Sequence, residues 1–160
     1  MELGSEATLT RIRKCLKQAE ITVREIEHAP TETSEASAAV RGEPLYVGAK
    51  ALLLKTDEAF RLFVLPADEK LDSASVKSEL GLKKLRFATR EELFELTGLV
   101  PGSVPPFGEP VLPFELFADS TIGTKEDKVA FNAGSLTHSI IMTATVWKQI
   151  AKPQVFRFGK

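Results

Sequence analysis

The sequence predicts a mixed α+β fold in which short helices flank one central, mostly antiparallel sheet. Segments with helical periodicity alternate along the chain with short apolar or alternating segments that are typical of strands. Several neighbouring strand segments are joined by connections too short for a parallel crossover, which favours antiparallel pairs. The chain has 160 residues, the usual size of one domain, and contains no low-complexity linker. We therefore expect a single domain over residues 1–160.

The N-terminal part of the chain is expected to form two helices and one strand. Residues 8–19 place apolar side chains at helical spacing between basic ones, which predicts an amphipathic helix. The alternating segment 23–27 predicts a strand. Polar residues followed by alanines over 31–40 predict a short helix that is capped near Thr33.

The middle of the chain holds its most apolar segments. The runs at 51–55 and 60–66 are separated by TDEA, which predicts an antiparallel hairpin near the centre of the sheet. Residues 72–81 predict a helix that Gly81 closes, because glycine commonly follows the last turn of a helix. The segment KLRFAT at 84–89 predicts a further short strand.

A helix and an irregular loop come next. Thr89 and Glu92 fit a capping box, and the helix that they start is expected to end at Gly98. The segment TGLVPGSVPPFG at 97–108 has three glycines, three prolines and no helical or strand period. A flexible linker is usually polar and rich in Gly and Ser. This stiff and apolar loop is better suited to form the wall of a pocket.

The C-terminal part is expected to contain four strands and one helix. The alternating segment 113–119 predicts the first of these strands. Residues 128–134 and 138–143 predict a second pair of strands around a tight turn. Residues 143–151 predict a short closing helix, and 153–158 a last strand.

Composition and charge limit the classes of partner. The formal net charge is −1, so any surface that binds an anion is expected to be local. The single cysteine, Cys15, excludes an intrachain disulfide and a cysteine-based metal cluster, and it fits a reducing compartment. The first residues contain no apolar signal core, and no apolar run approaches transmembrane length. We expect a cytoplasmic protein with no membrane partner.

Common catalytic motifs are absent from the sequence. It contains no GxxxxGK[ST], no GxGxxG after a strand, no HExxH and no GxSxG. His28 and His138 lie far apart in sequence, which disfavours a zinc site. Cys15 lies near Ile12 and Leu16 on the apolar face of its helix, as an inert buried thiol would. We expect no metal and no cofactor.

Lys50 is the most informative charged residue. It stands at the start of a strongly apolar strand, directly after Gly48 and Ala49. Lys50 could be an edge charge whose amine reaches water. Alternatively, its ammonium could point into a cleft and hold a carbonyl or phosphate oxygen as negative charge develops. Spacing alone favours the first interpretation.

Two later features have both a structural and a functional interpretation. The turn NAGSLTHS at 132–139 offers backbone N–H groups that could bind an anion or a carbonyl, but it could equally be an ordinary hairpin turn. Asp119 ends an alternating strand, where it could pair with a substrate amine or cap the following turn.

Five groups of residues together resemble the YbaK/prolyl-tRNA editing family, also called aminoacyl-tRNA deacylase or ProRS-insertion-like domains. The match spans about residues 8–151, and the order and spacing of its motifs make it specific. The motifs are HAPTETSEA (28–36), GAKALLLK (48–55), FVLPADEKLD (63–72), TGLVPGSVPPFG (97–108), and LFAD (116–119) with FNAGSLTHSIIMT (131–143).

The resemblance implies that the protein hydrolyses the ester that joins an amino acid to tRNA. Lys50 occupies the position of the family's functional lysine, and the Pro/Gly loop would line the pocket for the aminoacyl group. No side chain is an obvious general base, and in this family a ribose hydroxyl of the substrate is thought to assist. His138 is either a substrate contact or a hydrogen-bonded strand histidine. The implied substrate-binding residues are Thr33, Gly102, Val104, Pro105, Asp119, Gly134, Ser135 and His138.

The expected substrate is a mischarged tRNA, most of all one of the tRNA(Pro) type carrying Ala or Cys, with Ser and Thr as further candidates. Ala51 replaces a frequent threonine, and GSLTHS departs from the family's glycine-rich turn, so the amino acid stays open. The implied partners are the 3′ end of the aminoacyl-tRNA and a prolyl-tRNA synthetase or an elongation factor, with no DNA. We expect a free-standing monomer.

Two alternatives remain open on the sequence. The domain could be a non-catalytic module that binds tRNA or a synthetase, a possibility that Ala51 and the altered turn motivate. It could also be a hydrolase or binding protein for small molecules that uses the same pocket.

Overall fold

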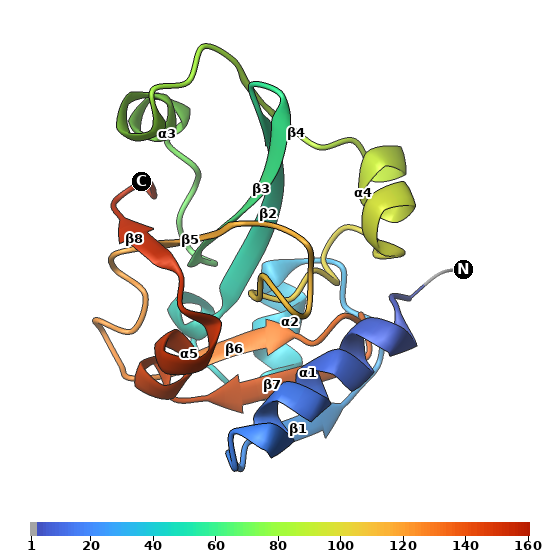
Figure 1. Cartoon of the computed structure of the whole chain (residues 1–160). Coiled ribbons are helices and arrows are strands. Elements are labelled where there is room, and N and C mark those ends of the chain that lie inside the picture. Colours follow the sequence, from blue (N-terminus) through green and yellow to red (C-terminus); the bar gives the residue numbers. More distant parts are fainter. Residues whose placement is uncertain (1–2) are drawn as a thin grey trace.

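The computed structural model describes residues 3–160 and confirms the α+β class (Figure 1). A short 3₁₀ helix, Leu45–Val47, adds one element to those expected from the sequence. The five α-helices of the described residues are α1 (Glu6–Gln18), α2 (Ser34–Arg41), α3 (Ser73–Leu80), α4 (Arg90–Thr97) and α5 (Ala144–Ala151). None of these helices is long and apolar enough to cross a membrane.

The expected strands are all present, but they divide between two sheets instead of forming one central sheet. One sheet has three strands in the order β1-β7-β6, and the other has five in the order β4-β2-β3-β5-β8. The strands are β1 (Arg24–Glu27), β2 (Ala49–Thr56), β3 (Ala59–Pro66), β4 (Leu85–Phe87), β5 (Leu116–Asp119), β6 (Val129–Asn132), β7 (His138–Met142) and β8 (Gln154–Phe156).

The pairing of the strands explains the division. The three-stranded sheet is antiparallel throughout, whereas β5 runs parallel to both β3 and β8 in the larger sheet. These parallel pairs become possible because long stretches with helices separate their strands along the chain. The two sheets touch where Gly48 and Ala130 form a single bridge, just before β2 begins.

Helix ends follow the chemistry that the sequence predicts. The Thr33 hydroxyl accepts a hydrogen bond from the Ala36 N–H and caps α2. Thr89 and Glu92 form the expected capping box at the start of α4. Gly81 and Gly98 end α3 and α4 in the left-handed conformation, which glycine adopts at little cost. Local sequence therefore fixes the ends of three of the helices.

The core lies on both faces of the β2–β3 hairpin. One large cluster includes Leu53, Val64 and the fully buried Trp147, and it extends to the smaller sheet and to α1. A second cluster, with Leu54 and Phe63, packs under α3 and the C-terminal segment. A strand buried on both faces reads as a continuous apolar run, as these two do. The start of β2 lies next to β6, where Ala49 is still part of the large cluster but Lys50 and Ala51 are only partly buried.

Candidate functional site

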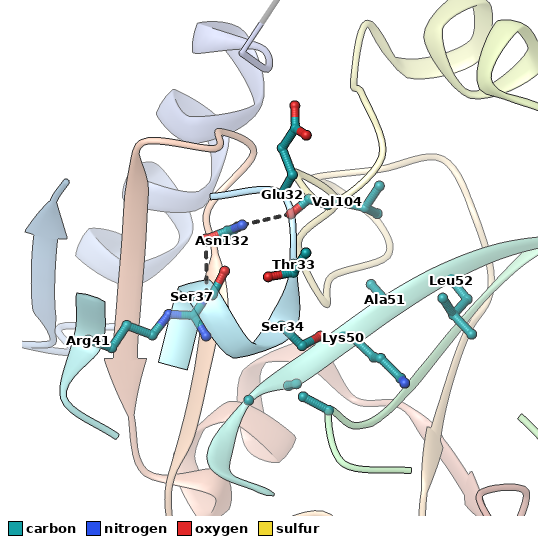
Figure 2. A pocket seen from close by; sticks show the side chains of 14 residues that line it. Glu32, Thr33, Ser34, Ser37, Arg41, Lys50, Ala51, Leu52, Val104 and Asn132 are labelled. Carbon is teal, nitrogen blue, oxygen red and sulfur yellow. Dashed lines mark hydrogen bonds between the residues drawn. The ribbon is translucent and has the colours of Figure 1, made fainter. Parts of the chain in front are cut away.

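A pocket of about 200 Å³ opens beside the start of β2 (Figure 2). Its walls come from α2 and the residues before it, from the first residues of β2, from the Pro/Gly loop and from the end of β6. The residues that line the pocket are Glu32, Thr33, Ser34, Ser37, Arg41, Gly48, Ala49, Lys50, Ala51, Leu52, Ala67, Gly102, Val104 and Asn132.

Lys50 lines this pocket from the edge of the larger sheet. It lies opposite Leu65 in the β2–β3 pair, and its amine donates a hydrogen bond to the Glu69 carbonyl. Burial lowers the pKa of Lys50, while the carboxylates of Asp68 and Glu35 act in the opposite direction. Figure 2 shows Lys50 and Arg41 on opposite sides of the pocket. The lysine is thus partly desolvated and held by a neutral group, so its charge is available to a ligand.

The Pro/Gly loop forms the wall that its composition predicts. Val100–Ser103 make a turn closed by a hydrogen bond of 3.0 Å from the Ser103 N–H to the Val100 carbonyl. Pro101 occupies the second position of this turn, and Gly102 the third with a φ of 87°, as a type II turn requires. Val104 lines the pocket, whereas Pro105 is buried behind it and is not among the lining residues.

The loop is backed by aromatic side chains. The Trp147 Nε1 donates a hydrogen bond of 3.0 Å to the Pro106 carbonyl. The Phe107 ring meets the Phe131 ring edge to face, with centroids 5.5 Å apart. These contacts and the fixed φ angles of the prolines restrict the loop from both sides. The wall is therefore stiff.

A buried guanidinium stands at the back of the pocket. Arg41 is only 6% exposed, and its Nε donates to the Ser139 Oγ at 2.9 Å while its Nη2 donates to the Asn132 Oδ1 at 3.0 Å. The Asn132 Nδ2 in turn donates to the Gly102 carbonyl at 2.8 Å. His28 lies 2.8 Å from the same Ser139 hydroxyl. Burial lowers the pKa of Arg41 to about 10, although Glu43 raises it.

Three residues with hydroxyl side chains also line the pocket. The Thr33 hydroxyl already accepts the capping hydrogen bond of α2, and the Ser37 hydroxyl donates to Thr31 at 2.8 Å. Ser34, at the start of α2, also lines the pocket. The structure therefore brings four of the predicted residues together, namely Lys50, Thr33, Gly102 and Val104.

Asp119 lies elsewhere and has a structural environment, as the turn-capping alternative predicts. Its Oδ1 accepts the N–H groups of Phe158 and Gly159 at 2.7 and 2.8 Å. Its Oδ2 accepts from the Thr121 N–H at 3.0 Å and from the Arg157 Nη1 at 2.8 Å. The carboxylate is fully buried and its acceptor sites are filled, so no oxygen is left to receive a substrate amine.

Gly134, Ser135 and His138 also lie apart from the pocket. The Gly134 carbonyl accepts the Ser5 N–H at 2.8 Å, because the turn packs against the start of α1. Ser135 and His138 line a different cavity between this turn and α1. Alternation along β7 explains the separation: Ser139 faces Arg41, so its neighbour His138 points to the opposite side of the sheet.

Sequence reasoning misses Arg41, Asn132 and Ser37. A usable signal exists for two of them, since Ser37 and Arg41 are four residues apart and share one face of α2. Asn132 ends an apolar strand within a motif that already pointed to the family. Its amide becomes meaningful only when the fold places it beside the Pro/Gly loop.

Comparison with known proteins places this geometry in context. The family described as "Aminoacyl-tRNA editing domain" matches residues 28–150. The "Multifunctional Ser/Thr-tRNA deacylase ProXp-y" of Escherichia coli K12 is 34% identical over 165 residues, which cover all of this chain and 97% of that protein. A proline–tRNA ligase of Bacillus licheniformis is 34% identical over 107 residues, covering 66% of this chain and 18% of the ligase.

Solved structures agree in fold. A candidate trans-editing enzyme for prolyl-tRNA synthetase superposes with a TM-score of 0.83 at 23% identity, covering 98% of both chains. The protein APE2540 superposes with a TM-score of 0.84 at 24% identity, covering 94% of this chain and 99% of its own. The match to the family covers most of the chain, and the similarity to the E. coli protein covers all of it. This chain belongs to the aminoacyl-tRNA editing domain family.

Proposed function

We propose that this protein is a free-standing aminoacyl-tRNA deacylase that hydrolyses the ester of mischarged tRNA in trans. The observation that carries the proposal is the pocket of about 200 Å³ that Lys50 and Gly102 both line. Small-molecule pockets usually measure about 300–1,000 Å³, so this one suits a small aminoacyl group. Full-length similarity to a relative that bears the name of a Ser/Thr-tRNA deacylase supports the same activity.

Seryl and threonyl groups are the substrates that the pocket suits best. Thr33, Ser34 and Ser37, which carry hydroxyls, line it, and such groups can bind a hydroxylated side chain. The hydroxyls of Ser135 and the neighbouring threonine lie in the other cavity instead. Alanyl and cysteinyl groups are small enough to enter, so they stay in the panel of candidate substrates.

In the proposed reaction, water attacks the ester carbonyl and the ribose oxygen leaves, which gives the free amino acid and uncharged tRNA. Lys50 stabilises the negative charge that develops on the carbonyl oxygen, or holds the terminal phosphate. Among residues 3–160, no histidine or cysteine lines the pocket, and a ribose hydroxyl of the substrate is the proposed proton carrier. The partner is the 3′ end of the tRNA, and a synthetase or an elongation factor would deliver it to a monomeric deacylase.

The test is deacylation of tRNAs charged with Ser, Thr, Ala, Cys and Pro by wild type, Lys50→Ala and Lys55→Ala. Lys55 is a matched control because it lies on the same strand but outside the pocket. We expect Lys50→Ala to lower kcat/KM at least about a hundredfold, the usual effect of removing one charge-stabilising donor. Lys55→Ala should retain wild-type activity.

Two results would contradict the proposed activity, and a third would contradict the proposed role of Lys50. No hydrolysis of any charged tRNA by wild type would favour a binding module without catalysis. Equal hydrolysis of amino acid esters that lack tRNA would favour a small-molecule hydrolase. Equal activity of wild type and Lys50→Ala would leave the deacylase assignment standing but would remove Lys50 from the mechanism.

A further inference from the structure

A chain of three side chains connects the buried face of α2 to the pocket wall. Arg41 donates to Ser139 at 2.9 Å and to Asn132 at 3.0 Å, and Ser139 donates to the Asn132 Oδ1 at 3.2 Å. The Asn132 Nδ2 donates to the Gly102 carbonyl at 2.8 Å (Figure 2). We call Arg41, Ser139 and Asn132 the Arg41 clamp.

The clamp allows only one orientation of the Asn132 amide. The guanidinium of Arg41 can only donate, so the atom that faces it must be the amide oxygen. The NH₂ group is thereby directed at the Gly102 carbonyl. If the amide turned over, a donor would face Arg41 and an oxygen would face the carbonyl of Gly102. The buried charge therefore fixes the direction of a hydrogen bond that ends in the loop.

The target of this hydrogen bond is a glycine at the exposed tip of the loop. Gly102 has a φ of 87°, and its backbone is exposed at the tip of the turn. Trp147 restrains the buried part of the loop through the Pro106 carbonyl. A Cβ at Gly102 would lie 3.3 Å from Leu136, so the turn already approaches the neighbouring segment closely. Asn132 is the side chain that holds this carbonyl.

We infer that the Arg41 clamp fixes the position of Gly102 in the pocket wall and thereby sets how well the pocket separates similar aminoacyl groups. This inference rests on the proposed deacylase function for its selectivity. One methyl group is worth about 10–200-fold in discrimination, and a wall that moves would lose part of that difference. Arg41 and Asn132 are positioning residues, and neither needs to touch the reacting ester.

The variant Asn132→Asp tests the clamp with the smallest change in shape. One carboxylate oxygen still accepts from Arg41 and Ser139, and the buried guanidinium gains an opposite charge. The other oxygen faces the Gly102 carbonyl, which repels it, so only the link to the loop is lost. Val76→Ala is the control for a general loss of stability, because Val76 is fully buried in the second core cluster, and none of the residues described in that cluster belongs to the Pro/Gly loop 97–108.

Two measurements decide the inference. We expect Asn132→Asp to lower the ratio of kcat/KM between the preferred aminoacyl-tRNA and its closest competitor about tenfold, while Val76→Ala leaves the ratio unchanged. We also expect amide hydrogen exchange over residues 99–108 to become faster in Asn132→Asp, with exchange in β2 and β3 unchanged.

An unchanged selectivity ratio in an active Asn132→Asp enzyme would overturn the inference. Unchanged exchange over residues 99–108 would do the same, and it needs no substrate. Inactivity of the wild type toward every charged tRNA would instead contradict the proposed function, and the exchange measurement would still decide whether the clamp holds the loop. Ser139→Ala provides a second variant, since it loosens Asn132 without adding a charge, and the same direction of change is expected.

Discussion

Asp119 and Arg41 are both charged and buried, but their surroundings differ. Asp119 is fully buried, and its carboxylate accepts from Arg157, Thr121 and two backbone N–H groups. Arg41 is 6% exposed, and its guanidinium donates to the neutral oxygens of Ser139 and Asn132. The charge of Asp119 is paired with Arg157 in the C-terminal segment, whereas Arg41, at the wall of a pocket, forms no salt bridge with any carboxylate of residues 3–160.

The difference teaches where burial of a charge indicates function. A buried charge is costly unless it is paired and hydrogen-bonded, so a fully paired one is explained by the fold that it stabilises. Asp119 joins β5 to the segment after β8 and needs no ligand to account for it. Arg41 lacks such an explanation within its own contacts, and its hydrogen bonds lead to the pocket. Position in sequence does not reveal this contrast.

The largest effect on stability is expected from Asp119→Ala, which removes the buried carboxylate that is paired with Arg157. The change leaves the buried N–H groups of Phe158 and Gly159 without an acceptor and leaves Arg157 without one of its carboxylates. Each buried N–H group left without its acceptor costs about 1–3 kcal/mol, whereas the half-exposed Arg157 adds little. We expect urea denaturation to show a loss of this size, while the deacylation rate per folded molecule stays close to wild type.

A control and a pH series sharpen this prediction. Glu115→Ala removes an exposed carboxylate that lies 3.6 Å from Arg61, and such surface pairs contribute about 0–1 kcal/mol. Burial would raise the pKa of Asp119, but hydrogen bonds from Thr121 and the backbone outweigh it and lower the pKa below 3.8. The unfolded chain therefore binds more protons as pH falls below about 4, so this stabilisation is present above that pH and is lost below it. Asp119→Asn should lose less stability than wild type between pH 5 and 3, and parallel losses would contradict the assignment.

The second prediction concerns Arg41→Met, which removes the buried charge that has no ion-pair partner in the described part of the chain. Methionine keeps much of the volume and removes the charge, so Ser139 and Asn132 lose a donor while the cost of burying a cation also disappears. We expect the free energy of unfolding to fall by only about 1 kcal/mol. Deacylation should nevertheless become less selective, because Ser139 alone then holds the orientation of the Asn132 amide. A stability loss as large as that of Asp119→Ala with unchanged selectivity would show that Arg41 acts like Asp119.

The sequence predicts the elements of this fold well because their signals are local. Helix ends are set by contacts between residues three or four apart in sequence, so the local sequence is enough to predict them. Examples are the N-caps Thr33 and Thr89 and the C-cap Gly98. The division into two sheets is not predictable in this way. It depends on which strands pair across long stretches of chain, and β5 finds β3 and β8 as parallel neighbours only in three dimensions.

The site residues, like the fold, could be predicted only where the signal is local in the sequence. Lys50 and Gly102 follow from motif and composition, and the fold brings both to one pocket. The face of the sheet on which His138 lies could not be predicted from the sequence. Side chains alternate along a strand, so a shift of one residue in its register would move His138 to the other face. Arg41, in contrast, was not predicted to belong to the site. A single arginine at the end of a polar helix is typical of a surface residue, and only the fold places Ser139 and Asn132 beside it.

The smallest effects are expected at the turn between β6 and β7, where the comparison can be tested on predicted residues. Ser135 and His138 line a cavity against α1, and the Ser135 hydroxyl lies 2.9 Å from the Thr137 hydroxyl and 3.4 Å from the His138 Nδ1. These groups satisfy one another, as those around Asp119 do, but they are only half-buried. Ser135→Ala and His138→Ala should therefore keep kcat/KM for each charged tRNA within about twofold of wild type, in the usual range of changes of about ±0.5 kcal/mol at such positions. A loss of tenfold or more in either variant, with the fold intact by circular dichroism, would mean that the tRNA reaches this cavity as well. The substrate would then extend across the smaller sheet from Lys50, and a polar cluster with satisfied hydrogen bonds would no longer be a reason to exclude a role in binding.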